Sequence, residues 1–136
     1  MIRKYSLGRE ERLKSRKLVD ELFASGTSVS VFPLRVFFAF LPVTSADDSY
    51  SKIGVTASRR NFKKAVDRNC IKRLLRESYR IQKHELRAVL ANSGFKVHVF
   101  FIYVDKQLPA YQVVFNAMTK CLRVLEKRKP INESSS

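Results

Sequence analysis

Residues 65–88 carry the strongest helical pattern in the chain, and this pattern restricts the fold more than any other feature. On a helix that turns about 100° per residue, one side carries Arg68, Asn69, Lys72, Arg73, Arg76, Arg80 and Lys83. The opposite side carries Ile71, Leu74, Leu75, Ser78, Ile81 and Gln82. A helix with one apolar side must bury that side against another element. The segment therefore predicts a helix that packs on a sheet and presents a row of cations on its outer side.

Three other segments have the patterns of β-strands. Residues 96–104 (KVHVFFIYV) predict a central strand, because both sets of alternating residues are largely apolar. Residues 32–41 and 52–58 have the composition of strands, and the polar segment 44–50 indicates a loop between them. Because these two strands are consecutive and joined by a loop, we expect them to pair antiparallel.

Two further helices complete the expected fold. Residues 11–24 and 110–127 predict the first and last helices, and Gly26 supplies a stop after the first. The apolar side of the last helix carries Val113, Val114, Ala117, Met118, Cys121, Leu122 and Leu125. This order of elements predicts a small α+β protein, a split α/β sandwich. A chain of 136 residues fits one domain, which we place at residues 1–129, followed by a disordered tail at 130–136.

The charge of the chain indicates its class of partner. There are 27 Lys and Arg against 12 Asp and Glu, a net charge of +15. Like charges four residues apart destabilise a helix by about 0.2–0.5 kcal/mol per pair, and the phosphates of a nucleic acid relieve that repulsion. A membrane-lying helix would carry bulkier apolar residues, so a membrane surface fits less well. The remaining alternative is a basic face that is merely solvated.

The sequence offers no catalytic or metal-binding pattern. The spacing of His84 and His98, and of Cys70 and Cys121, matches no acid–base, nucleophilic or metal site. Isolated cysteines are typical of small core residues in a reducing compartment, although the sequence alone leaves a disulfide open. The chain has no segment like a signal peptide, and no apolar stretch approaches the roughly 20 residues of a membrane span. We therefore expect a cytoplasmic protein that does not bind membranes.

The basic segment resembles the signature of the bacterial ribonuclease P protein family. The family's run Ala-Val-x-Arg-Asn-x-x-Lys-Arg-x-x-Arg-Glu reads AVDRNCIKRLLRE at residues 65–77. The resemblance extends over about residues 10–127. It includes Arg12-Leu13-Lys14, Gly26-Thr27-Ser28, Ile53-Gly54-Val55 and Ser58-Arg59-Arg60.

The chain departs from the family in three places. Cys70 stands where the family has the second arginine of an Arg-Asn-Arg core. Residues 61–64 (NFKK) lack the glycine usual before the basic helix and form a turn one residue longer. The family often has aromatic residues at the positions of Val19 and Phe23, so one ring is missing here.

The resemblance implies both a fold and a function. The fold is like the second domain of ribosomal protein S5, with a four-stranded sheet, three helices and a left-handed β-α-β crossover that carries the basic helix. The function is that of the protein subunit of ribonuclease P, an endoribonuclease that removes the 5′ leader of precursor tRNA. The partners are the catalytic RNA subunit and precursor tRNA. Hydrolysis belongs to the RNA with Mg²⁺, and the protein alone binds no cofactor.

The residue patterns and the resemblance together give two sets of expected site residues, in which alternation places Arg35 and Phe37 on one face of their strand. The residues expected to bind the RNA subunit are Arg59, Arg60, Lys63, Lys64, Arg68, Asn69, Lys72, Arg73, Arg76 and Arg80. A cleft between the first helix and the sheet holds the leader, and single-stranded RNA requires aromatic rings beside cations. The residues expected there are Phe23, Arg35, Phe37 and Lys52. The alternative for the two rings is an ordinary place in the core.

Three other functions compete with this interpretation. A ribosomal or other structural RNA-binding protein would share the charge and the fold, but it would not need a leader cleft. A self-sufficient nuclease would need acid–base or metal-binding residues that the sequence lacks. A DNA-binding helix protein would show helix-turn-helix spacing before the basic helix, and none is present.

Overall fold

The computed structural model describes residues 12–13, 15–43 and 51–128. In chain order the elements are α1 (Arg16–Ser25), β1 (Thr27–Val31), β2 (Leu34–Pro42), β3 (Ser51–Ala57), α2 (Ala65–Ala91), β4 (Phe95–Tyr103) and α3 (Tyr111–Arg128). This is the expected α+β class, with three helices and a four-stranded sheet. The predicted loop 44–50 and tail 130–136 lie outside the described residues.

The strands of the sheet lie in the order β1-β2-β4-β3. β2 pairs antiparallel with β1 and β4, whereas β3 pairs parallel with β4. The prediction of a central strand at 96–104 is confirmed. The predicted antiparallel pairing of 32–41 with 52–58 is wrong, because β4, whose residues are apolar on both sides, lies between these two strands.

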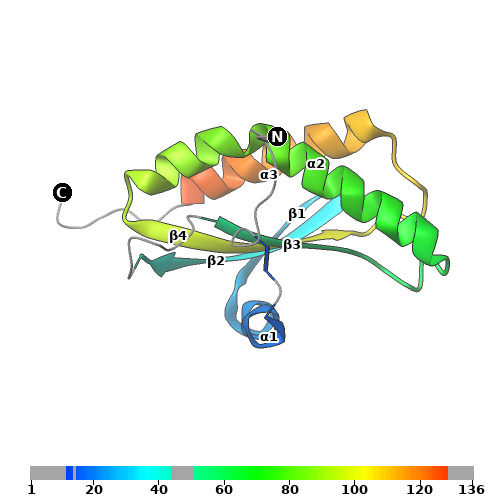
Figure 1. Ribbon diagram of the computed structural model, residues 1–136, viewed down its shortest axis with the longest axis horizontal. Helices are drawn as coiled ribbons and strands as arrows, with labels where there is room; N and C mark the ends of the chain where they lie inside the picture. Colours follow the sequence, from blue (N-terminus) through cyan, green and yellow to red (C-terminus); the bar gives the residue numbers. More distant parts are fainter. Residues whose placement is uncertain (1–11, 14, 44–50, 129–136) are drawn as a thin grey trace, which may run out of the picture.

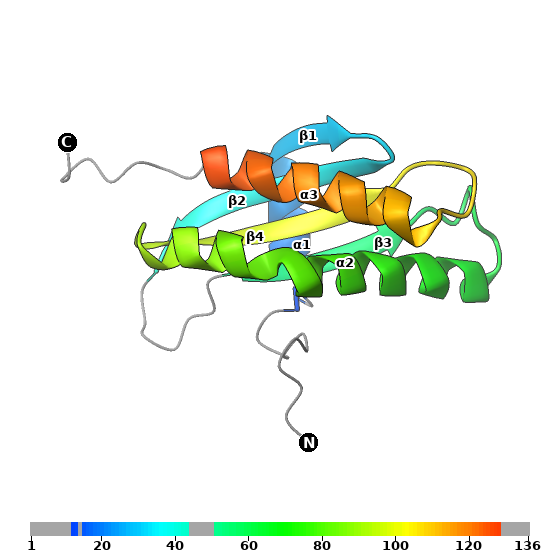
Figure 2. The same cartoon turned by 90° about the horizontal axis from the view of Figure 1, so that it is seen from above.

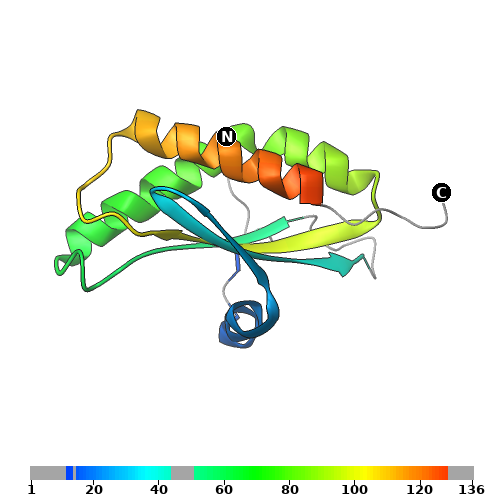
Figure 3. The same ribbon diagram turned by 180° about the vertical axis from the view of Figure 1, so that it is seen from behind.

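The helices lie on both sides of the sheet. α2 and α3 lie side by side on one face, and α1 lies on the other (Figures 1 and 3). The crossover from β3 through α2 to β4 is left-handed, as the views in Figures 1 and 2 together show. The core lies between the sheet and the α2–α3 layer. Its fully buried residues include Leu34, Val36, Ile71, Leu75, Tyr79, Leu86, Leu90, Val97, Val99, Phe101, Val114, Met118 and Leu125.

The first helix is shorter than the predicted 11–24. It begins at Arg16, because the side chain of Ser15 accepts a hydrogen bond from the Leu18 amide (3.4 Å) and caps the helix. Before the cap, Arg12 forms a parallel bridge with Ile53, and the Leu13 amide donates to the Ile53 carbonyl at 2.7 Å. The bridge and this hydrogen bond hold Arg12 at the edge of β3.

The buried side of α2 winds around the helix more than a straight stripe would. Tyr79 lies four residues after Leu75 and is fully buried, and Lys83, four residues further on, is only 2% exposed. A step of four residues advances about 40° around a helix, so this row turns toward the side predicted to face outward. Lys83 is thus not part of the outer cationic row, and Ile81, predicted as core, is 42% exposed. On α3, Val113 is likewise 49% exposed rather than buried.

Candidate nucleic-acid interface

The loop before α2 presents four exposed cations. They are Arg59, Arg60, Lys63 and Lys64. The loop needs no glycine, because none of the described non-glycine residues has a positive φ. Instead, Phe62 is buried with its ring centroid 6.0 Å from that of Tyr103, and its amide donates to the Ser58 carbonyl at 3.0 Å. An aromatic anchor thus holds the glycine-less turn in an ordinary conformation.

Two of the predicted cations on α2 are engaged within the protein. Nη1 of Arg68 donates to the carbonyls of Phe62 (2.8 Å) and Lys63 (3.0 Å), so this guanidinium ties the loop to the helix. Arg80 forms an ion pair with Glu77 one turn away. The sequence pattern placed both side chains outward, but it did not reveal these local partners.

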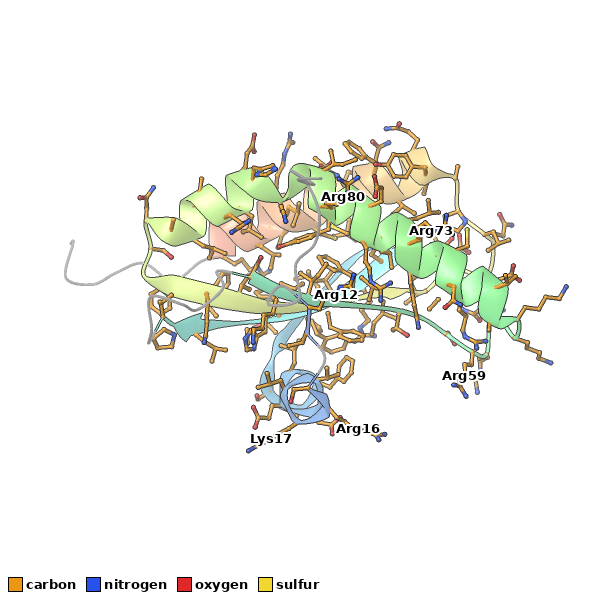
Figure 4. All side chains as sticks on the ribbon, in the orientation of Figure 1. Arg12, Arg16, Lys17, Arg59, Arg73 and Arg80 are labelled. Carbon is orange, nitrogen blue, oxygen red and sulfur yellow. The ribbon has the colours of Figure 1, made fainter. Side chains whose placement is uncertain are left out.

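The exposed part of the cationic row lies in the first half of α2. Asn69, Arg73 and Arg76 are exposed, and Lys72 is half-buried. In Figure 4, α2 lies in front of α3, and Arg73 and Arg80 are labelled along α2. Arg59 lies near the start of this helix. Cys70 is also exposed, so the family position that it replaces belongs to the outer surface. We call the following residues the helix surface: Asn69, Lys72, Arg73 and Arg76 of α2, and the loop cations Arg59, Arg60, Lys63 and Lys64.

The opposite face of the sheet carries a cluster of three aromatic rings. Phe23 of α1 meets Phe37 of β2 edge-on, with ring centroids 4.9 Å apart, and meets Phe100 of β4 at 5.2 Å. Phe23 is 41% exposed, and the other two rings are half-buried. The guanidinium carbon of Arg35 lies 5.4 Å from the centroid of the Phe37 ring. These four residues form the aromatic surface, and none belongs to the buried core.

Lys52 lies on the same face of the sheet. In the register it is the partner of His98, while Gly54, two residues later, is the partner of Phe100. Residues two apart on a strand point to the same side. The structure thus brings Phe23, Arg35 and Phe37 together as expected. It places Lys52 two residues before Gly54, the partner of Phe100.

Sequence reasoning missed three residues that lie on or beside these surfaces. Phe100 had a visible signal, because alternation in 96–104 already separated it from the buried set that includes Val99 and Phe101. Gly54 and Arg12 had weaker signals, since only the pairing of β3 with its neighbours brings them to these positions.

The described residues contain neither a metal-binding cluster nor a helix that could span a membrane. No group of three or more His, Cys, Asp or Glu side chains is placed to bind a metal ion within them. His84 is exposed on α2, and His98 is buried on β4. None of the helices in this part of the chain is both long and apolar enough to cross a bilayer.

Comparison with known proteins gives consistent matches. Residues 7–128 match the family described as Ribonuclease P. The ribonuclease P protein component of Porphyromonas gingivalis is 36% identical over 118 residues, which cover 87% of this chain and 85% of that protein. The component of Chlorobaculum tepidum is 36% identical over 103 residues, covering 72% of this chain and 67% of the relative.

Solved structures share the fold. The RNase P protein from Thermotoga maritima superposes with a TM-score of 0.62 at 23% identity, over 88% of this chain and 99% of that one. The RNase P protein of Staphylococcus aureus gives 0.62 at 19% identity, over 84% of this chain and 94% of that one.

Proposed function

The chain belongs to the ribonuclease P protein family, and from that premise we propose that its two surfaces bind two different RNAs. As a member of the family it is an RNA-binding subunit of an endoribonuclease holoenzyme. In this proposal the helix surface binds the catalytic RNA subunit, and the aromatic surface binds the 5′ leader of precursor tRNA. Family membership also decides against the alternative of a ribosomal or other structural RNA-binding protein.

The observation that carries this division is the placement of the two surfaces on opposite faces of one sheet. α2, the helix of the exposed Arg73 and Arg76, covers one face of the sheet, and α1 lies on the other (Figure 1). On the α1 side, the Phe23 ring meets the rings of Phe37 and Phe100. A protein with two such surfaces can hold two RNA segments at once without bringing their phosphates into contact.

Each surface suits a different kind of RNA. Arginine side chains on a helix bind phosphate oxygens through forked hydrogen bonds, which position a folded RNA without reading its sequence. Aromatic rings stack with unpaired bases of any sequence, at about 1–3 kcal/mol per base. The partly exposed rings with Arg35 beside them therefore favour a single strand of variable sequence, as a leader is.

Within the holoenzyme the protein would position substrate rather than cleave it. In this proposal no residue of the chain acts as a catalytic acid or base. Mg²⁺ held by the RNA subunit would supply the activated water. Holding the leader raises the fraction of substrate bound in the productive orientation. We place this activity in the cytoplasm.

The test is reconstitution with transcribed ribonuclease P RNA and precursor tRNA at low Mg²⁺. We expect the protein to stimulate 5′ maturation and to favour leader-bearing precursor over mature tRNA. Binding of both RNAs without any stimulation at low Mg²⁺, or without preference for the leader, would refute the proposal.

A further inference from the structure

A small cavity lies at the edge of the sheet, between the two surfaces. Its volume is about 140 Å³, and it is lined by Arg12, Arg76, Phe100, Leu13 and the β3 residues 53–55. Arg76 belongs to the helix surface, and Phe100 belongs to the aromatic surface. The cavity is therefore the place where the two surfaces meet around the edge of β3.

Two cations share this cavity. Burial lowers the pKa of Arg76, and the nearby charge of Arg12 lowers it further. Among the described residues, no carboxylate forms an ion pair with either arginine, although Arg80 on the same helix has such a partner in Glu77. Two like charges placed together are unfavourable unless an anion neutralises them.

The backbone holds Arg12 in this position. The parallel bridge to Ile53 and the 2.7 Å hydrogen bond from the Leu13 amide fix the chain against the edge of β3. In Figure 4, Arg12 lies at the edge of the sheet, below α2 with Arg73 and Arg80 and above α1 with Arg16 and Lys17. Arg12 therefore lies between the cations of α2 and those of α1.

We propose that Arg12 and Arg76 together bind one phosphodiester group of the leader strand where the strand crosses the edge of β3. This inference rests on the proposed function, because it assumes that the leader lies on the aromatic surface. A guanidinium donates two parallel hydrogen bonds to phosphate oxygens, so two guanidiniums can surround one phosphate. The Phe100 ring in the wall of the cavity favours the leader over the RNA subunit, since the same ring belongs to the surface where leader bases stack.

The first test measures the affinity of the reconstituted holoenzyme for precursor tRNA and for mature tRNA. The variants are Arg12→Gln, Arg76→Gln and the double variant, with Arg128→Gln as the matched control, because Arg128 is an exposed cation of α3 outside the cavity. We expect Arg12→Gln to weaken precursor binding about tenfold or more and to leave mature tRNA unaffected. Because both arginines share one phosphate, the double variant should lose less than the product of the two single losses.

The second test locates the phosphate. Precursors are made with one uncharged methylphosphonate linkage at successive positions of the leader. We expect one position at which this change weakens binding by the wild-type holoenzyme but not by the Arg12→Gln holoenzyme. Arg12→Lys keeps the charge without the fork, and we expect it to restore only part of the affinity.

Two results would overturn the proposed phosphate site of Arg12 and Arg76. One is an equal loss for precursor and mature tRNA, or a loss confined to the RNA subunit, with circular dichroism showing folded variants. The other is that no leader position is found at which a methylphosphonate weakens binding by the wild-type holoenzyme but not by the Arg12→Gln holoenzyme. If the wild-type holoenzyme prefers precursor over mature tRNA and Arg12→Gln has no effect, only the phosphate site of Arg12 and Arg76 is refuted. If the wild-type holoenzyme shows no such preference, the proposed function is refuted.

Discussion

The Phe100 ring lies across Gly54 of the neighbouring strand, so closely that a Cβ at position 54 would stand 2.5 Å from two of the ring carbons. The two residues are direct partners in the parallel β3–β4 register. The missing side chain at 54 thus leaves room for the ring, which in turn meets Phe23. A glycine in β3 thereby sets the shape of the aromatic surface on the next strand.

Gly54→Ala should therefore displace the Phe100 ring and weaken leader binding. We expect a loss of about 1–3 kcal/mol in the free energy of unfolding, measured by urea denaturation, and reduced preference for precursor over mature tRNA. Adding Phe100→Leu should recover stability but not the preference. An alanine variant with unchanged stability and unchanged preference would show that the contact has no role.

Phe37→Ala should weaken precursor binding by about 1–3 kcal/mol if a base stacks on the ring. Mature tRNA, which lacks the leader, should bind as before, and the same holds for Phe23→Ala. The measurement is equilibrium binding of both RNAs to holoenzyme, with circular dichroism as the folding control. Equal weakening for both RNAs would place the leader elsewhere.

Arg68→Ala and Arg73→Ala each remove one cation from α2, but they should differ in stability. Arg68 donates two hydrogen bonds to the carbonyls of Phe62 and Lys63, whereas Arg73 is exposed. We expect Arg68→Ala to lower the free energy of unfolding by about 1–3 kcal/mol and Arg73→Ala to leave it nearly unchanged. Equal unfolding curves for the two variants would mean that Arg68 does not anchor the loop.

The two cysteines should react with a disulfide reagent at very different rates. Cys70 is exposed, whereas Cys121 is buried and burial raises the pKa of its thiol from 9.0 to about 12. The thiolate is the reactive form. At pH 8 the folded protein should therefore titrate one thiol rapidly, and the second only in urea. Rapid reaction of both thiols in the folded state would contradict the packing of α3.

The sequence predicted elements better than it predicted neighbours. Residues 96–104 had to be central, because their two faces are both apolar, and β4 is central. Which strands flank it depends on tertiary packing, so the expected pairing of 32–41 with 52–58 was wrong. β1 was missed because Thr27–Val31 is an edge strand with only two apolar residues, Val29 and Val31, both half-buried.

The candidate sites show the same limit. Alternation placed Arg35 and Phe37 on one face of their strand, and the cleft implied by the family resemblance placed Phe23 beside them; the structure brings the three together. The sequence patterns did not show that Lys83 is buried, because the turning of the buried row on α2 depends on what the helix packs against. Nor did they place Arg12 in a cavity with Arg76, since that contact joins residues far apart in the chain.

The salt dependence of RNA-subunit binding tests the role of the helix surface most directly. Each lost phosphate contact should reduce the slope of log affinity against log salt by roughly 0.7–0.9. Leu75→Ala is the control, because Leu75 is fully buried: it should cost about 2–5 kcal/mol of stability without changing the slope. We predict that the Lys72→Ala, Arg73→Ala double variant folds normally and binds with a clearly shallower slope. A folded double variant with the wild-type slope would show that these cations are only solvated and that the RNA subunit binds elsewhere.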